Sequence, residues 1–133
     1  MPPKEPQYEM LLDLLKEQGR STFGLMANDS WNNEPKRTLF TLSRYKFVAK
    51  MLEGKRHVLE VGCADAFATR IVRQAVDAVT FASFDLIFIN DVKSRNTEKW
   101  HMDASVHDMV RDGPFGGGSF DRLFAIDVLE HML

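Results

Sequence analysis

An acidic residue followed by a turn of small residues is the pattern in this chain that is best suited to binding a ligand. Residues 58–66 read Val-Leu-Glu-Val-Gly-Cys-Ala-Asp-Ala, and a helix-like segment follows over 67–76. Small residues let the backbone approach a ligand, and the helix offers unpaired N–H groups and the positive end of its dipole. The pattern predicts a strand, a turn and a helix that hold a nucleotide, with Gly62 closest to the ligand and Glu60 organising the turn or reaching the ligand.

Acidic side chains also follow the next two predicted strands. In an open α/β sheet, ligands bind at the C-terminal ends of the strands. Asp85 lies about 20 residues beyond the glycine turn, where a carboxylate can accept hydrogen bonds from both hydroxyls of a ribose. Asp108 follows the third strand and is expected to hydrogen-bond an adenine on which Met109 packs. Asp91 and Asp103 stay open as alternatives, because the pattern does not fix the ends of the second and third strands.

The N-terminal part of the chain has one clear helical pattern. A helix is predicted over residues 8–18, with Gly19 as its stop, because four apolar residues share one face. These residues are Met10, Leu11, Leu14 and Leu15. Residues 20–34 have no clear period and are interpreted as a loop. Its aromatic anchors, Phe23 and Trp31, either hold the segment on the core or cover the substrate side.

A second helix is predicted over residues 38–52. Asn33-Glu34-Pro35 is typical of a helix start, with a capping side chain and proline in the first turn, and Gly54 closes the helix. One apolar stripe is expected to face the core, while the basic residues lie largely off it and are solvated. The stripe consists of Phe40, Phe47, Val48 and Met51.

The rest of the chain alternates strands with helices. Strands are predicted over 58–61, 78–84, within 100–107 and over 122–126, and helices over 67–76 and 86–95, the latter with an extended second strand as the alternative. A glycine-rich loop is expected over 112–119. This alternation predicts an α/β fold with a Rossmann-like, mostly parallel sheet and helices on both faces. The chain is interpreted as one domain over 1–133, with an N-terminal helical segment over 1–54 and a Rossmann-like core over 55–133.

The composition is typical of a globular protein and does not indicate binding to nucleic acids or membranes. The 133 residues are 44% hydrophobic and 27% charged, and the formal net charge is −2. Such a balance gives no electrostatic case for nucleic-acid or membrane partners, and no apolar run approaches the roughly 20 residues of a membrane helix. Cys63 is the single cysteine, which excludes an internal disulfide and fits a reducing compartment. We therefore expect a cytoplasmic protein.

Taken in order, four segments resemble those of class I S-adenosylmethionine-dependent methyltransferases. Residues 59–66 resemble the first motif of that family, and Asp85 matches the acid after its second strand. Residues 106–109 resemble the segment that contacts adenine. Residues 120–131 resemble the fourth-strand segment common in small-molecule methyltransferases. The resemblance covers residues 58–131, and its order and spacing make it more specific than the glycine turn alone.

The resemblance implies S-adenosylmethionine as the cofactor. Gly62, Cys63 and Ala64 would approach its methionine part together with Glu60, Asp85 would hold the ribose, and the remaining contacts would come from Asp108, Met109 and Asp127. Asp127 and His131 are the candidates for catalytic residues, with His131 as a general base. Many methyl transfers need only alignment and desolvation of an activated sulfonium, so a mechanism without a general base stays open as the alternative.

Other polar side chains near the turn are given structural interpretations. Asp65 is expected to cap the helix that follows the turn, and Glu130 to pack or cap. Cys63 is interpreted as a small buried side chain in preference to a reactive thiol. The four histidines have no metal-ligand spacing, so no metal is expected.

The chain departs from the family pattern in two ways. Ala64 and Ala66 stand where the family often has glycine, and an alanine disfavours a positive φ. The family has about seven strands, whereas four are predicted here. A fourth strand left at the edge of the sheet could pair with another chain, so a homo-oligomer formed through this edge is one expectation.

The function that these observations favour is methyl transfer from S-adenosylmethionine to an unidentified small-molecule acceptor, which would lie near Asp127 and His131. The first alternative is a nicotinamide-dependent oxidoreductase, which shares the turn and the ribose acid. Such an enzyme needs a glycine-rich turn for a pyrophosphate, whereas residues 62–66 contain one glycine. The second alternative is a non-catalytic module that binds the cofactor or only associates.

Overall fold

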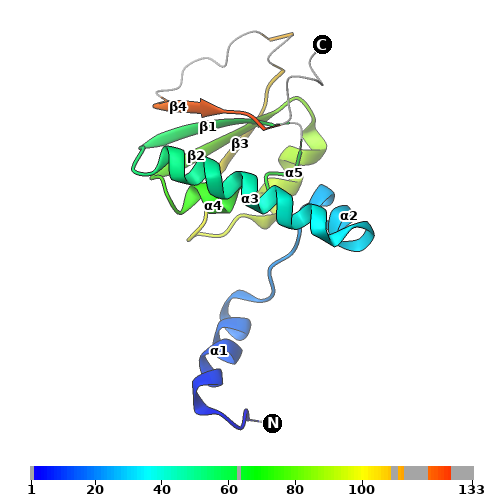
Figure 1. Cartoon of the computed structure of the whole chain (residues 1–133), viewed down its shortest axis with the longest axis vertical. Coiled ribbons are helices and arrows are strands. Elements are labelled where there is room, and N and C mark those ends of the chain that lie inside the picture. The colour runs from blue at the N-terminus through cyan, green and yellow to red at the C-terminus, as the bar shows by residue number, and fades with distance from the viewer. Residues whose placement is uncertain (1, 63, 109–110, 113–119, 127–133) are drawn as a thin grey trace.

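Four strands form one parallel sheet in the computed structural model, which describes residues 2–62, 64–108, 111–112 and 120–126. The strands are β1 (His57–Gly62), β2 (Ala78–Ser83), β3 (Asp103–Val106) and β4 (Arg122–Phe124). Their order in the sheet is β3-β2-β1-β4, and every pairing is parallel (Figure 1). The predicted parallel, Rossmann-like α/β sheet is confirmed, and the C-terminal ends of the strands meet at one edge.

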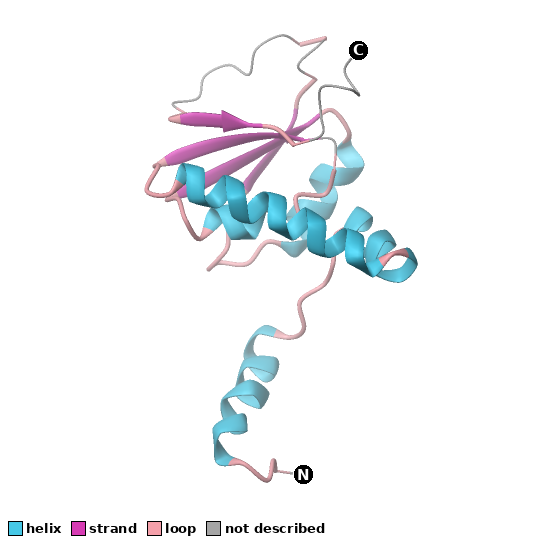
Figure 2. Ribbon diagram, in the orientation of Figure 1, coloured by secondary structure: helices cyan, strands magenta, loops and turns pink. Residues whose placement is uncertain are grey.

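Helices precede and connect the strands. They are the 3-10 helix η1 (Pro6–Tyr8), α1 (Glu9–Gln18), α2 (Leu25–Asn33), α3 (Pro35–Leu52), α4 (Thr69–Arg73) and α5 (Leu86–Arg95). The last three lie together on one face of the sheet, whereas α1 projects away from the body (Figure 2). The described residues therefore supply one of the two helical layers expected from the sequence.

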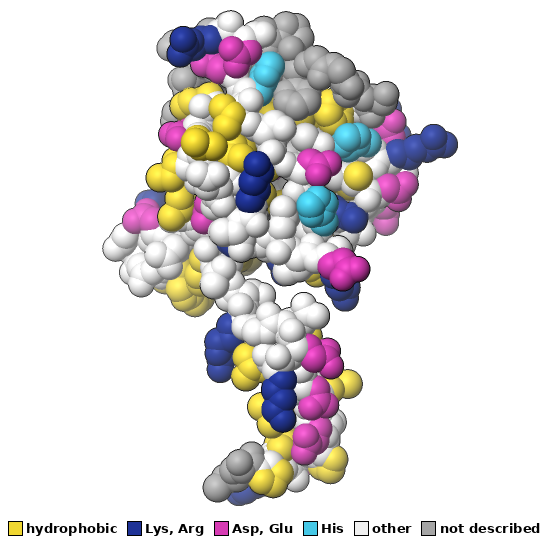
Figure 3. Space-filling model, turned by 180° about the vertical axis from the view of Figure 1, so that it is seen from behind, with side chains coloured by type: hydrophobic (Ala, Val, Ile, Leu, Met, Phe, Trp, Pro, Cys, Tyr) yellow, Lys and Arg dark blue, Asp and Glu magenta, His cyan; other side chains and the backbone are white. Residues whose placement is uncertain are grey.

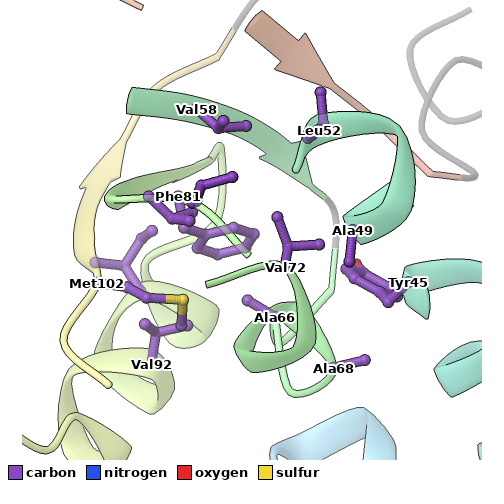
Figure 4. Close-up of a cluster of buried hydrophobic side chains, with 13 residues drawn as sticks. Tyr45, Ala49, Leu52, Val58, Ala66, Ala68, Val72, Phe81, Val92 and Met102 are labelled. Carbon is purple, nitrogen blue, oxygen red and sulfur yellow. The ribbon is translucent and has the colours of Figure 1, made fainter. Parts of the chain in front are cut away.

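The core lies between the sheet and this helical layer. Val58 to Val61 are all buried, as expected for a central strand of a parallel sheet. Figure 4 shows the ring of Phe81 in the middle of the cluster, with Val72 from α4 on one side and Met102 on the other. Because this core fixes β1 and β2 side by side, it also fixes the start of the turn that follows β1.

The interpretation of residues 20–34 as a loop is wrong, because α2 occupies Leu25–Asn33. This helix buries none of its residues and has no apolar period. Its first N–H groups are instead satisfied from a distant part of the chain: the backbone nitrogens of Met26 and Ala27 donate to Asp65. A tertiary cap of this kind leaves no periodic signal in the sequence.

The N-terminus of α3 was only partly anticipated. The helix begins at Pro35, where a proline in the first turn is well tolerated. Asn33 is not its cap, because Asn33 is the last residue of α2. Glu34 stands at the cap position and makes no capping hydrogen bond with its side chain.

The apolar stripe predicted to face the core from α3 is also wrong. Phe40, Phe47 and Met51 are exposed, and Val48 is half-buried. The residues of α3 that are buried are Thr38, Tyr45, Ala49 and Leu52. Two of these four carry hydroxyl groups, which a search for apolar periodicity ranks below phenylalanine and methionine.

The remaining elements differ from the prediction mainly in length. Helix α5 has the predicted bounds, so the alternative of an extended second strand is excluded. Helix α4 is shorter than the predicted 67–76, because residues 66–68 still belong to the turn. Strand β4 has three residues and ends before Ile126.

Candidate functional site

The turn after β1 begins at Gly62, which pairs with Ser83 of β2. A Cβ atom on this glycine would lie 2.5 Å from Cε2 of Phe81. That overlap with a fully buried ring explains the glycine by core packing. The same contact brings the turn close to the centre of the core (Figure 4).

Glu60 is buried under the turn and is satisfied by two hydroxyl groups. Tyr45 Oη donates to Glu60 Oε2 at 2.5 Å, and Thr69 Oγ1 donates to Glu60 Oε1. Burial raises the pKa of Glu60 to about 7, while the two hydrogen bonds act in the opposite direction. Burial also raises the pKa of Tyr45 far above its ordinary value, so the phenol remains a donor. Glu60 therefore joins α3 and α4 to β1.

Ala66 adopts the left-handed conformation, with φ 53°. L-residues pay about 1–2 kcal/mol in this region, where glycine is at ease. Ala66 is also one of the two positions where alanine stands in place of the glycine that is common in the methyltransferase pattern. The backbone thus keeps a glycine-like conformation although the residue is alanine.

Replacing Ala66 with glycine is expected to cost about 1–2 kcal/mol less stability than the same change at Ala68, since both changes remove a buried methyl group and only the change at Ala66 relieves strain. Urea denaturation measures the change. Ala68→Gly is the matched control, because Ala68 has φ −78° and gains nothing from glycine. An equal loss of stability in the two variants would contradict the assignment of strain to Ala66.

Asp65 is buried and caps α2, not the helix that follows it. Its Oδ2 accepts from the backbone nitrogens of Met26 and Ala27, each at 2.9 Å, and its Oδ1 accepts from Phe67 N at 3.1 Å. Gly24 lies so close that a Cβ atom there would be 2.1 Å from Asp65 Oδ2. The segment before α3 is therefore held directly on the turn after β1.

Aromatic rings reinforce this contact. The ring of Phe23 packs on Phe67 of the turn at 5.0 Å between centroids and on Trp31 of α2 at 5.8 Å. Of the two roles considered for Phe23 and Trp31, the geometry supports anchoring of the N-terminal segment. Figure 1 shows α2 on the side toward which the strands point.

A carboxylate and a guanidinium of α5 complete the arrangement. Asp91 Oδ2 accepts from Leu25 N at 3.0 Å and from Arg95 Nη2 at 3.3 Å. Arg95 Nη2 also donates to the carbonyl of Asp65, and the guanidinium lies 6.0 Å from the ring centroid of Phe67. Asp91 is thus engaged within α5 and at the start of α2, away from the end of β2.

Asp85 stands directly after β2 and before α5. Its Oδ1 accepts from Ile87 N at 3.1 Å and caps α5. Within the described residues no hydrogen bond reaches its Oδ2. Asp85, and not Asp91, is therefore the acid at the C-terminal end of β2.

Asp108 follows β3 at the same edge of the sheet. The preceding residue, His107, donates its N–H to the carbonyl of Ser83 at 2.7 Å, which carries the pairing of β3 with β2 one residue further. Asp108 Oδ1 accepts from Arg111 N at 3.1 Å. Asp103, the alternative, is the first residue of β3 and lies at the opposite end of that strand.

Four of the predicted site residues lie outside the described residues: Cys63, Met109, Asp127 and His131. Ala64 is described and is half-buried in the turn. The structure thus brings Glu60, Gly62 and Ala64 together in and under the turn after β1. Asp85 and Asp108 stand at the ends of the next two strands.

Sequence reasoning missed several side chains that build this site. These side chains are Tyr45, Thr69 and Arg95. Asp65 and Asp91 were considered, but their contacts with the N-terminus of α2 were not predicted. One signal was available: an acid inside an apolar strand must have hydrogen-bond donors as partners, and Tyr45 and Thr69 each carry one. The arginine and the capping contacts depend on tertiary geometry and left no such signal.

The pocket found among the described residues lies away from the C-terminal edge of the sheet. A pocket of about 460 Å³ lies beside β3 and involves Thr80, His101, Asp103 and Phe120, near the amino-terminal ends of the strands. Among the described residues no three His, Cys, Asp or Glu side chains gather as a metal would require. No helix in the described part is both long and apolar enough to cross a membrane.

Three solved methyltransferases have a similar fold. Magnesium protoporphyrin IX methyltransferase (ChlM) from Synechocystis PCC 6803 with bound SAH matches 94% of this chain and 57% of its own, with a TM-score of 0.57 and 16% identity. N-methyltransferase NodS from Bradyrhizobium japonicum WM9, in complex with S-adenosyl-L-homocysteine, matches 80% of this chain and 50% of its own, with a TM-score of 0.51 and 16% identity. A dimethyladenosine transferase from Plasmodium falciparum matches 69% of this chain and 34% of its own, with a TM-score of 0.53 and 20% identity.

These similarities establish the fold. The chain has the class I fold of S-adenosylmethionine-dependent methyltransferases, as the resemblance in the sequence predicted, and spans between about one third and three fifths of the length of these three proteins. No family model and no curated protein matches the sequence.

Proposed function

We propose that this chain binds S-adenosylmethionine at the C-terminal edge of its sheet and serves as a methyltransferase for a small-molecule acceptor. One observation carries the proposal: the turn after β1, Asp85 and Asp108 stand at one edge of a sheet whose fold is shared with two structures solved with S-adenosylhomocysteine. In open α/β sheets this edge is where ligands bind.

The residues at the edge fit such a ligand chemically. Asp85 keeps one carboxylate oxygen available while the other caps α5, so a ribose hydroxyl can donate to it without breaking the helix start. Gly62, Cys63 and Ala64 would approach the methionine part, and Asp108 and Met109 the adenine. The turn also contains the carboxylate of Asp65, which suits a cationic sulfonium.

S-adenosylmethionine supplies an activated methyl group, so the protein's task is to orient the acceptor and exclude water. The acceptor would lie beyond β4, near Asp127 and His131. His131 would take a proton from the acceptor where the acceptor carries one to lose. The turn after β1, which Glu60 supports from below, would fix the cofactor's position relative to the acceptor.

Calorimetric titration with S-adenosylhomocysteine, S-adenosylmethionine and NAD tests the proposal. Both adenosyl ligands are expected to bind, and Asp85→Asn to weaken them roughly tenfold or more because one ribose contact is lost. Asparagine keeps an oxygen to cap α5, so the variant should fold. The matched control is Asp103→Asn, at the opposite end of β3, which should bind normally.

The outcome also separates the alternatives. Binding of NAD alone would favour an oxidoreductase and contradict the proposal. Absence of binding by all three ligands would favour a module that only associates. Binding of the adenosyl ligands without methyl transfer to any acceptor tested would reduce the proposal to a cofactor-binding domain.

A further inference from the structure

Helix α1 presents an apolar face that the rest of the described chain does not cover. It buries none of its residues, and the side chains of Met10, Leu11 and Leu14 are 55–69% exposed. Figure 3 shows α1 standing clear of the body, with acidic side chains along one side. A ten-residue helix is marginal in water by itself, so its stability depends on packing of this face against another surface.

Helix α3 carries a second apolar stripe, opposite the residues that it buries. Phe40, Phe47 and Met51 are spaced by seven and four residues, which brings them onto one face, and each is at least 57% exposed. The rise from Phe40 to Met51 is about 16 Å, and α1 is about 15 Å long. The two exposed stripes therefore match in length and in character.

The charges of the two helices are complementary. Helix α3 contains five Lys and Arg residues and no Asp or Glu. Helix α1 contains three acids, Glu9, Asp13 and Glu17, and one lysine. Anionic lipid surfaces attract basic helices and repel acidic ones. A basic helix is therefore a better partner for the acidic α1 than a lipid surface is.

We propose that α1 docks on the exposed stripe of α3 in a second copy of this chain, so that two copies exchange their N-terminal helices. Such an exchange is reciprocal and closes as a two-fold dimer with two identical α1–α3 contacts. Within one chain α1 projects away from the body and buries none of its residues, so its apolar face does not lie on α3 of the same copy (Figure 1).

Sedimentation equilibrium tests this exchange. The chain is expected to dimerise, and Leu14→Ser on α1 and Phe47→Ser on α3 are each expected to weaken the dimer roughly tenfold or more. Both side chains are exposed in one copy, so the variants should keep the fold, which circular dichroism checks. Ile87→Ser is the control, since Ile87 is 55% exposed on α5 and should not affect the dimer.

Cysteine cross-linking identifies the contact. Chains with Leu14→Cys are mixed with chains with Phe47→Cys, both in a Cys63→Ser background, and a disulfide between the two chains is expected on mild oxidation. A chain with both substitutions that closes only an internal disulfide would overturn the exchange. So would a monomer at every concentration, or a dimer insensitive to both serine substitutions, which would point instead to pairing through β4.

Discussion

Replacing Glu60 with glutamine is expected to raise the free energy of unfolding by up to about 3 kcal/mol at pH 8 and to change it little at pH 4. Glutamine keeps the shape of the side chain. Its oxygen can accept from Tyr45, and its amide can donate to the Thr69 hydroxyl. The variant removes the cost of a buried charge. The second N–H of the amide and the Thr69 hydroxyl each lose a partner at this position, so about 3 kcal/mol is an upper limit for the gain.

The sign of the effect follows from the pKa of Glu60. Burial raises that pKa from 4.5 in the unfolded chain to about 7 in the folded one. Below pH 4.5 both states hold the proton, and the native state has its full stability. Between pH 4.5 and 7 the unfolded chain loses the proton while the folded chain keeps it, so stability falls as pH rises. Above pH 7 the loss is complete.

The measurement is a series of urea denaturation curves from pH 4 to pH 8 for both proteins. The difference between glutamine and glutamate should grow between pH 4.5 and 7 and then level off. Glu53→Gln serves as the control, because Glu53 is exposed at the end of α3. A difference that is the same at pH 4 and pH 8 would show that Glu60 does not titrate in this range.

Removing the carboxylate of Asp65 is expected to release residues 23–33 from the turn after β1. In Asp65→Ala three backbone N–H groups lose their acceptor, those of Met26, Ala27 and Phe67. Two of these three N–H groups lie in the first turn of α2, where a carboxylate also interacts favourably with the positive end of the helix dipole. We expect a loss of about 2–3 kcal/mol.

Amide hydrogen exchange locates the effect. The amides of Met26 and Ala27 should exchange faster in Asp65→Ala than in the unchanged protein. In Asp65→Asn, which keeps one acceptor oxygen, the exchange rates of these amides should lie between those of the unchanged protein and those of Asp65→Ala. Asp29→Ala is a control on the exposed side of α2. Unchanged protection of Met26 and Ala27 would contradict the role of Asp65 as their cap.

The parallel sheet and the position of β1 were largely predictable from sequence, whereas the ends of the later strands were not. Parallel strands buried on both faces give continuous apolar runs, as in β1 and β2. The positions of Gly62 and Asp85 relative to those runs then follow directly. Ala66 was singled out because alanine stands where glycine is usual, and its φ of 53° is the conformation that such a position requires.

The N-terminal half was harder to predict because tertiary contacts decide it. Helix α2 has no apolar face and is held by Asp65 and Asp91 from other elements. In α3 the core side includes Thr38 and Tyr45, whereas Phe40 and Phe47 face outward. Apolar periodicity identifies a helix but not its orientation when both faces are partly apolar. The buried hydroxyl of Tyr45 makes sense only once Glu60 is seen beside it.

The position of β4 beside β1 has a consequence for synthesis on the ribosome. Arg122, the start of β4, comes 60 positions after Gly62, the end of β1. At 5–20 residues per second, roughly 3–12 s pass before the last strand can pair. During that time one side of β1 has unpaired N–H and C=O groups while β2 already holds the other side. The nascent chain therefore passes through an interval in which its central strand can capture a neighbouring polypeptide.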